Sequence, residues 1–314
     1  MKTTLLITSD TGSGNRSQTK VSNAMYETSK RLRIPPEALC LLGDNIYETG
    51  VTSVKDPQFK HKFEIPYKRF DIPIYLCLGN HDYGNSHFDD GRWKHQIEYT
   101  KYSRKWNMPS RYYHKQFGPC DFFFLDTNLD MMSQQEIRNQ LSDVKNMIRK
   151  STQPWKILCG HHTWRSVGGH GNAETRVEDF LKELMSERDY TIDAYLCGHD
   201  HCKNHHQVTL PCKRKVHTIV VGTGGKNYEP HMKYFYNLVD DTHMHFHSPN
   251  LGYMTWEARP TKIRIVFYDQ NNNREHSHTL KKHKKSKKSK KSKKSKKSKK
   301  SKKSNLGIIY NEKE

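Results

Sequence analysis

Five short apolar runs, each closed by polar residues, constrain this chain more than any other feature. They occupy residues 3–10, 38–44, 72–82, 155–162 and 193–201, and each ends in Gly, Asp, Asn or His. Apolar runs of this length that stop at turn residues are typical of buried strands. Because helical patterns lie between the runs, we expect an α/β layered domain.

The clearest helical pattern covers residues 133–149. Ser133 and Glu136 are spaced as a capping box, and the apolar residues that follow share one helix face. Further strands are predicted at 111–117, 121–126, 206–209, 216–222, 252–258 and 262–269. This number of strands favours two β-sheets packed face to face, with helices on the outside.

The basic charge of the chain is concentrated near its C-terminus. The formal net charge is +21, but residues 281–303 contain sixteen lysines and no acidic residue, which leaves +5 for all other residues. A run of Lys-Lys-Ser repeats can bury no apolar surface and is expected to be disordered. The strand pattern stops at about Asn271, so we predict a globular domain over residues 1–272 and a disordered basic tail over residues 273–314.

The N-terminal apolar stretch holds only four or five residues before an aspartate, which is too short for a signal peptide. No run of about eighteen apolar residues occurs in the sequence. The seven cysteines are scattered, and several fall within apolar runs, as buried thiols do in a reducing compartment. We therefore expect an intracellular protein with no signal peptide and no transmembrane segment.

The polar residues that close the five runs are all of metal-ligand type. In chain order they are Asp10, Asp44, Asn80 with His81, His161 with His162, and His199 with His201. The carboxyl ends of strands in an α/β sheet face a common crevice, so these side chains can converge there. They outnumber the three or four protein ligands of a single catalytic zinc, which favours two metal ions with Asp44 as the bridge. Paired ions of this kind are suited to in-line displacement at phosphorus.

The order of these motifs resembles the calcineurin-like metallophosphoesterases and, among them, the small tartrate-resistant purple acid phosphatases. The stretches "GDNIYETGV" (43–51), "YSRKWNMPSRYY" (102–113), "SQQEIRNQLSDVKNMI" (133–148) and "YLCGHDH" (195–201) are also similar to that family. The resemblance covers roughly residues 4–270. It implies a four-layer sandwich of two mixed β-sheets flanked by helices, and an acid phosphatase that hydrolyses phosphate monoesters by attack of a metal-bound hydroxide.

Tyr47 is the residue that distinguishes a resemblance to purple acid phosphatases from one to metallophosphoesterases in general. Most metallophosphoesterases begin with Asp-x-His, in which the histidine is a ligand, whereas this chain has Gly12 at that position. A phenolate oxygen from Tyr47 would replace the missing ligand, and a hard anionic oxygen favours a trivalent ion. The alternative is that Tyr47 only packs against the turn.

The resemblance implies a role for each motif residue. Fe(III) would be held by Asp10, Asp44, Tyr47 and His201, and a divalent Fe(II), Zn(II) or Mn(II) by Asp44, Asn80, His161 and His199. His162 competes with His161 for its place, but the family's ligand follows the glycine directly, here Gly160. His81 resembles the residue that orients the phosphate, and His170 resembles the proton donor to the leaving group.

Several alternatives stay open from the sequence. The substrate would be a small phosphate monoester or a phosphoprotein, and a phosphoprotein phosphatase or phosphodiesterase of the same superfamily is the runner-up. The third alternative is a protein whose basic tail binds nucleic acid or an anionic membrane. We expect the protein to be a monomer. His243, His245 and His247 alternate along a predicted strand and could bind metal, although a solvated sheet edge is the simpler interpretation.

Overall fold

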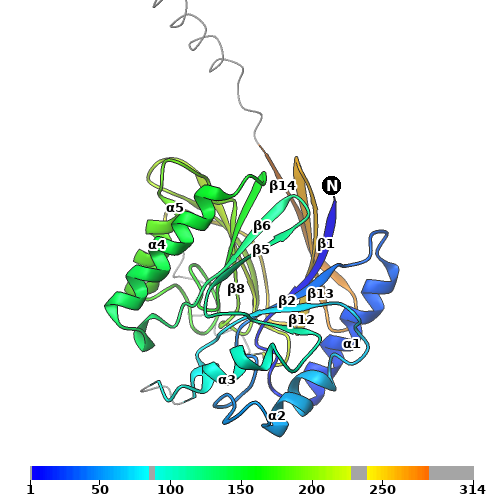
Figure 1. Cartoon of the computed structure of the whole chain (residues 1–314). Coiled ribbons are helices and arrows are strands. Elements are labelled where there is room, and N and C mark those ends of the chain that lie inside the picture. Colours follow the sequence, from blue (N-terminus) through cyan, green and yellow to red (C-terminus); the bar gives the residue numbers. More distant parts are fainter. Residues whose placement is uncertain (1, 85–88, 228–238, 283–314) are drawn as a thin grey trace, which may run out of the picture. The chain divides into compact units, whose positions relative to one another are not determined.

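The computed structural model describes residues 2–84, 89–227 and 239–282. Within them, residues up to Leu280 form one structural unit built on two seven-stranded sheets. The sheets lie face to face, and helices cover both outer surfaces (Figure 1). The predicted four-layer arrangement of two mixed sheets flanked by helices is confirmed.

The first sheet has the strand order β14-β13-β12-β1-β2-β3-β4. Strand β1 pairs in parallel with β2 on one side and antiparallel with β12 on the other, while β2, β3 and β4 continue in parallel. The strands are β1 (Thr3–Thr8), β2 (Ala38–Leu42), β3 (Ile74–Cys77), β4 (Trp106–Asn107), β12 (Gly252–Arg259), β13 (Lys262–Asp269) and β14 (Arg274–Lys281).

The second sheet has the order β11-β9-β10-β8-β7-β6-β5. Its centre is parallel, from β6 through β7 and β8 to β10, and antiparallel strands close both edges. The strands are β5 (Tyr113–Phe117), β6 (Cys120–Phe124), β7 (Trp155–Cys159), β8 (Ala194–Cys197), β9 (Lys203–Thr209), β10 (Lys215–Val221) and β11 (Thr242–Ser248).

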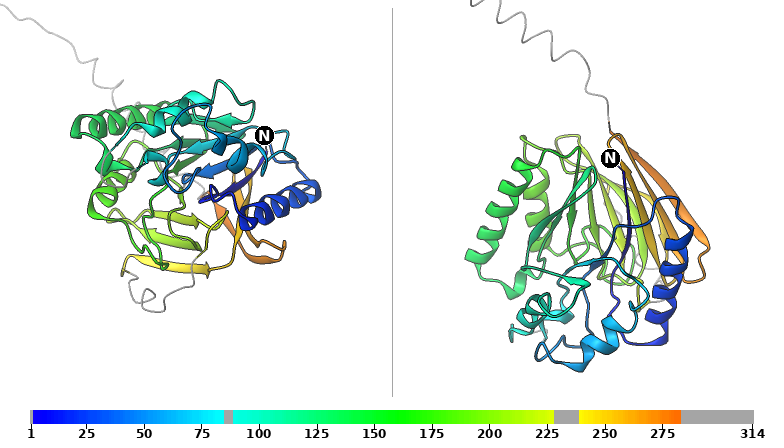
Figure 2. Two further views of the ribbon diagram at one scale, coloured as in Figure 1. Left: turned by 90° about the horizontal axis from the view of Figure 1, so that it is seen from below. Right: turned by 45° about the vertical axis from the view of Figure 1, so that its right-hand side comes forward.

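Helices α4 and α5 cover the outer face of the second sheet, and α1 covers the first sheet (Figures 1 and 2). Helix α4 begins after Ser133, whose side chain forms the predicted capping box with Glu136. The helices and helical turns are α1 (Arg16–Arg31), α2 (Pro57–Phe59), η1 (Lys60–Glu64), η2 (His81–Tyr83), α3 (Arg92–Tyr99), η3 (Leu129–Met131), α4 (Gln134–Lys150) and α5 (Thr175–Met185).

Strand alternation divides the aromatic residues of β6 between two cores. Phe122 and Phe124 point into the space between the sheets, whereas Phe123 packs with Ile148 of α4 and Leu181 of α5. Successive side chains of a strand point to opposite faces, so one strand supplies both layers. Strand β6 is therefore apolar on both faces over Phe122–Phe124, as expected of a strand buried on both sides.

The globular domain extends further than the sequence indicated. We predicted that it ends at residue 272, but Arg274–Lys281 forms strand β14 at the edge of the first sheet. Leu280 is only 3% exposed and belongs to the core between the sheets. The boundary at 272 is therefore wrong, because this strand carries mostly polar side chains and merges in sequence with the lysine run. The remainder of the predicted tail, residues 283–314, lies outside the described residues.

Candidate active site

The five strands that carry the predicted motifs end at one edge of the sandwich. Asp10, Asp44 and Asn80 follow the parallel strands β1, β2 and β3 of one sheet, and His161 and His199 follow β7 and β8 of the other. The backbone N–H of His199 donates to Asp10 Oδ2 at 3.0 Å, which ties the two sheets together at this edge. We call the set of Asp10, Asp44, Tyr47, Asn80, His161, His199 and His201 the strand-end site.

One half of the strand-end site gathers around the Tyr47 hydroxyl. That hydroxyl lies 2.9 Å from Asp10 Oδ1 and 3.1 Å from His201 Nε2, and His201 Nε2 lies 3.3 Å from Asp10 Oδ1. Tyr47 and Asp10 are buried. Two oxygens and an imidazole nitrogen therefore converge, and together they could coordinate one metal ion.

The other half gathers around the Asn80 side chain. Asn80 Oδ1 lies 3.1 Å from His161 Nε2 and 3.1 Å from His199 Nδ1. Asp44 contacts this half, because its Oδ1 lies 3.3 Å from His161 Nε2. It also belongs to the first half, since ligand atoms of Asp10, Asp44 and His201 all lie within 4.8 Å of one another. Asp44 is thus the residue that touches both groups.

Three residues of the strand-end site have a left-handed backbone. The φ angles are 57° at Asp10, 52° at Asp44 and 67° at His199. This region is uncommon for residues other than glycine, although Asp and His tolerate it better than most. Such backbone outliers cluster at functional sites, where the surrounding structure fixes them. In each case the chain leaves a strand and turns the side chain toward the common edge.

The backbone explains why position 12 carries no side chain when position 47 carries tyrosine. The Gly12 N–H donates to the Asp44 carbonyl at 3.1 Å, and the Tyr47 N–H donates to the Gly12 carbonyl at 3.0 Å. A Cβ atom at Gly12 would lie 2.2 Å from the Asn45 carbonyl oxygen, which no real structure permits. The loop that presents Tyr47 therefore occupies the space that a side chain at position 12 would need.

The ionisable groups of the site shift one another's pKa values. Burial by itself would raise the pKa of Asp44, but the adjacent His161 lowers it well below its ordinary value. Burial works against protonation of His161, yet Asp44 raises its pKa to about 9. Burial, with Asp10 and Asp44 close by, raises the pKa of Tyr47 far above that of a free phenol. The two buried carboxylates, Asp10 and Asp44, favour a bound cation at this edge, and a cation bound by Tyr47 would have to displace the proton of its hydroxyl.

A cavity of about 270 Å³ opens beside the strand-end site. Asn80, His162, His170 and His199 line it together with residues 127–131 and 172–174. The His170 ring stacks on His199 with centroids 4.2 Å apart. His81 lies on the other side of Asp44, and its backbone N–H donates to Asp44 Oδ1 at 3.1 Å. The centroid of the His81 ring is 4.6 Å from that of the Tyr47 ring. Both predicted catalytic histidines thus adjoin the strand-end site, but only His170 lines the cavity.

His162, the alternative to His161, has a different place. Its Nδ1 pairs with Thr127 Oγ1 at 2.8 Å, and its ring faces the cavity rather than Asp44. The Thr127 hydroxyl also accepts the backbone N–H groups of His161 and His162 at 3.2 and 3.0 Å. Sequence reasoning missed Thr127 and Asn128, although they follow β6 as the other motif residues follow their strands. The apolar run "FFFLDTN" (122–128) carried the same signal.

Asp82 is a third residue whose role was missed. It is buried and accepts hydrogen bonds from the backbone N–H groups of Asn45, Ile46 and Gly79 at 2.8–3.1 Å. These bonds hold the turns that present Asp44 and Asn80. Burial, followed by the nearby Asp44, raises the pKa of Asp82 to about 6. Its position after "GNH" (79–81) gave no sign that it binds backbone rather than an ion.

Comparison with known proteins is consistent with this geometry. The model of the calcineurin-like phosphoesterase family matches residues 3–203. Purple acid phosphatase 7 of Arabidopsis thaliana is 27% identical over 290 residues, which cover 86% of this chain and 83% of the relative. Tartrate-resistant acid phosphatase type 5 of Rattus norvegicus is 34% identical over 183 residues, which cover 51% of this chain and 53% of the relative.

Solved structures show the same fold at low sequence identity. The structure titled "GAP50 the anchor in the inner membrane complex of Plasmodium" has a TM-score of 0.74 at 19% identity, and the match covers 91% of this chain and 90% of that one. Purple acid phosphatase PPD1 from yellow lupin seeds has a TM-score of 0.69 at 16% identity, with 90% of this chain and 54% of that chain covered. Among the described residues, no helix is long and apolar enough to cross a membrane.

The family model spans most of the chain, from β1 to the start of β9. That span contains every residue of the strand-end site. The curated relatives are named purple acid phosphatases and tartrate-resistant acid phosphatases, as the sequence resemblance predicted. The chain belongs to the calcineurin-like phosphoesterase family.

Proposed function

We propose that this protein is an acid phosphatase that hydrolyses phosphate monoesters with two metal ions in the strand-end site. The names of its relatives support the reaction class. The observation that carries the proposal is the division of the site into two donor groups that share Asp44. Asp10, Tyr47 and His201 would hold one ion, and Asn80, His161 and His199 the other, with Asp44 contributing to both.

The first ion is proposed to be Fe(III). Burial and two neighbouring carboxylates make the Tyr47 hydroxyl hard to ionise, so its proton is replaced only by a strongly charged cation. A phenolate and two carboxylates are hard donors, which favour a hard trivalent ion. The second group offers an amide oxygen and two imidazoles, a set that suits Fe(II), Zn(II) or Mn(II). When bound, such a pair would supply Lewis-acid charge and an activated water for attack at phosphorus.

His170 is proposed to deliver the proton to the leaving group. It lines the cavity, and its backbone N–H donates to Asp200 Oδ1 at 3.3 Å, which fixes the loop that carries it. Burial lowers the pKa of His170, while Asp200 acts in the opposite direction. A phosphate dianion in the cavity would raise that pKa again and favour the imidazolium needed for proton donation.

His81 is proposed to orient the phosphate from the opposite side. Its backbone position is fixed by the Asp44 carboxylate, and its side chain is 32% exposed, so the ring can reach a ligand at the mouth of the site. The two histidines would then contact different oxygens of the substrate. Positioning of this kind raises the rate by holding the reacting groups in line.

The test combines metal analysis, the visible spectrum and turnover of an activated aryl phosphate. We expect iron in the strand-end site, a phenolate-to-iron absorption band in the oxidised protein, and loss of that band in Tyr47→Phe. Tyr67→Phe is the matched control, because Tyr67 is equally buried but lies in the core. A colourless, iron-loaded wild-type protein would remove Tyr47 from the metal. Preference for an aryl phosphate diester over the monoester would point to a phosphodiesterase instead.

A further inference from the structure

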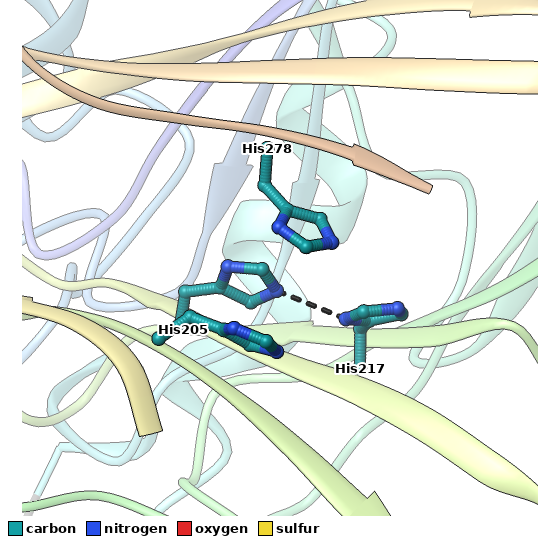
Figure 3. Close-up of side chains that lie close together, drawn as sticks. His205, His217 and His278 are labelled. Carbon is teal, nitrogen blue, oxygen red and sulfur yellow. Dashed lines mark hydrogen bonds between the residues drawn. The ribbon is translucent and has the colours of Figure 1, made fainter. Parts of the chain in front are cut away.

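A second group of histidines lies between the two sheets and outside the strand-end site. His205 of β9, His217 of β10, His245 of β11 and His278 of β14 each offer a ring nitrogen, and these atoms all lie within 4.8 Å of one another. We call them the four-histidine cluster. His205 is fully buried, and the other three are half-buried. Figure 3 shows His278 reaching from its strand toward His205 and His217 of the facing sheet.

Sheet register explains how residues far apart in the sequence meet here. His217 lies opposite Gln207, two positions along β9 from His205, so both histidines share the face that looks toward the first sheet. On β11 the pairing is irregular between Met244 and Phe246, which places His245 at a bulge. A bulge changes the direction of a side chain, and here it turns His245 to the same group.

We infer that the four-histidine cluster is a metal site that binds one Zn(II) ion and joins the edges of the two sheets. Zn(II) takes four ligands in tetrahedral geometry, and the Zn–N distance of about 2.0–2.1 Å requires nitrogens about 3.3–3.4 Å apart. His205 Nε2 and His217 Nδ1 are 2.9 Å apart, so small rotations of these side chains reach that spacing. His278 comes from the opposite sheet, which suits a tetrahedral ion better than a square-planar one.

The hydrogen bonds of the cluster leave ring nitrogens available to bind a cation. The buried Nε2 of His245 has no hydrogen-bond partner among the described residues. His205 has a partner at its other nitrogen, since His276 Nε2 lies 3.4 Å from His205 Nδ1. For His217 the outer nitrogen lies 3.3 Å from Gln207 Nε2, and a 180° turn of that amide would place its oxygen there to accept the N–H of a ligating ring. Such outer partners orient a ligating imidazole and leave the inner nitrogen for the metal.

The protonation states also favour metal binding. Burial and the neighbouring histidines lower the pKa of His217 to about 3 and that of His245 to about 4, and burial lowers the pKa of His278. Lys215 acts in the same direction on His217 and His245. Neutral imidazoles are the form that binds metal, and burial together with the close approach of four rings disfavours the charged form. Four protein ligands leave no open position, which indicates a structural rather than a catalytic ion.

The test uses the full chain in an Asp10→Asn, Asp44→Asn background, which weakens the strand-end site. Titration with Co(II), a spectroscopic substitute for Zn(II), should give one bound ion with the visible absorption of tetrahedral cobalt. His278→Gln keeps the polarity and approximate size of the side chain but removes the ring nitrogen. The His278→Gln substitution should weaken Co(II) binding by at least about 10²-fold, which is the loss that removal of an outer hydrogen-bond partner alone can cause. His61→Gln is the matched control, because His61 is exposed on η1.

A second measurement does not depend on that background. In the otherwise unchanged protein, whose strand-end site is first loaded with metal, Zn(II) at a hundredfold excess over its dissociation constant for the cluster should raise Tm by about 5 °C, and His278→Gln should remove this increase. Turnover of the aryl phosphate should stay the same. The inference is wrong if the background protein binds no Co(II), or if His278→Gln and His245→Gln bind as much Co(II) as their parent.

Discussion

The strand-end site and the four-histidine cluster use similar side chains at different places on the strands. The strand-end residues lie just beyond the last residue of each strand, where the backbone turns and a cavity of about 270 Å³ remains beside them. The cluster residues lie within their strands and face a second sheet. The first arrangement leaves room for a substrate, and the second encloses a metal ion. Position along the strand therefore separates a site suited to chemistry from one suited to cross-linking.

The charges of the two sites differ as well. The strand-end site contains Asp10 and Asp44 beside its histidines, whereas the cluster contains imidazoles alone. Carboxylate and phenolate oxygens favour hard ions of high charge, and a set of neutral imidazoles suits Zn(II). We therefore expect the cluster and the Tyr47 half of the strand-end site to select different metals from the same solution.

Substitution of Asp44 should have the largest effect and should act on one site only. Asp44→Ala removes the carboxylate that touches both donor groups, so turnover of an aryl phosphate should fall by about 10³-fold or more. Metal analysis should show loss of ions from the strand-end site, while the ion in the cluster stays. Asp71→Ala, at an exposed carboxylate, is the control. Unchanged turnover in Asp44→Ala would contradict the two-metal proposal.

His170→Ala should have the next largest effect, and its size should depend on the substrate. We expect a loss of about 10²-fold on alkyl phosphates and a smaller loss on an activated aryl phosphate, because only a poor leaving group needs a proton in the transition state. The measurement is kcat for both substrates across a range of pH. An equal loss on the two substrates would assign His170 a role in binding rather than in proton transfer. The strand-end site would then lack the chemical step that sets it apart from the four-histidine cluster.

Chelation should distinguish the two sites by rate. The strand-end site adjoins a cavity, so a small chelator can reach its ions, whereas the cluster is closed by four ligands. The half-time for release from the cluster should be longer on the order of tenfold. Release can be followed by metal analysis after rapid desalting, with activity measured in parallel. Simultaneous release of all ions would show that the cluster is not closed.

Two truncations should have the smallest and most selective effects on turnover. A chain that ends at Lys282 keeps β14 and removes most of the lysine run, so turnover should stay within about twofold, since surface changes away from packed features have little effect. The same truncation should abolish low-salt binding to nucleic acid, because that attraction depends on released counterions. Equal retention of full-length and shortened chains on a polyanion would exclude a binding role for the lysines.

The matched truncation ends at residue 272 and removes β14. It takes away His278 and the buried Leu280, so zinc-dependent stabilisation should disappear and Tm should fall. Comparison of the two chains, by zinc titration and thermal unfolding, separates the contribution of the strand from that of the lysines. If both chains respond equally to zinc, His278 is not a ligand.

The sequence predicted the strand-end residues well because each one follows an apolar run. It predicted their convergence because parallel strands end at a common edge. Strand β14 was missed for the opposite reason. Leu280, like the half-buried His276 and His278, is directed toward the core, so two of the three inward positions carry imidazoles and no apolar alternation appears. The spacing of His243, His245 and His247 was noticed, but their partners on other strands could not be seen without the register.

The pairing of β1 with β12 has a consequence for synthesis and folding. Residues Thr3–Ile7 find one of their two neighbours at Met254–Ala258, about 250 positions later, so β1 keeps an open edge until nearly the whole domain has left the ribosome. All residues of the strand-end site have by then been translated, yet the sheet that presents Asp10 is still incomplete. Long-range pairings of this kind slow folding and leave strand edges exposed to other chains. A chain whose synthesis stops between residues 202 and 253 would therefore carry every strand-end residue but would be prone to aggregate.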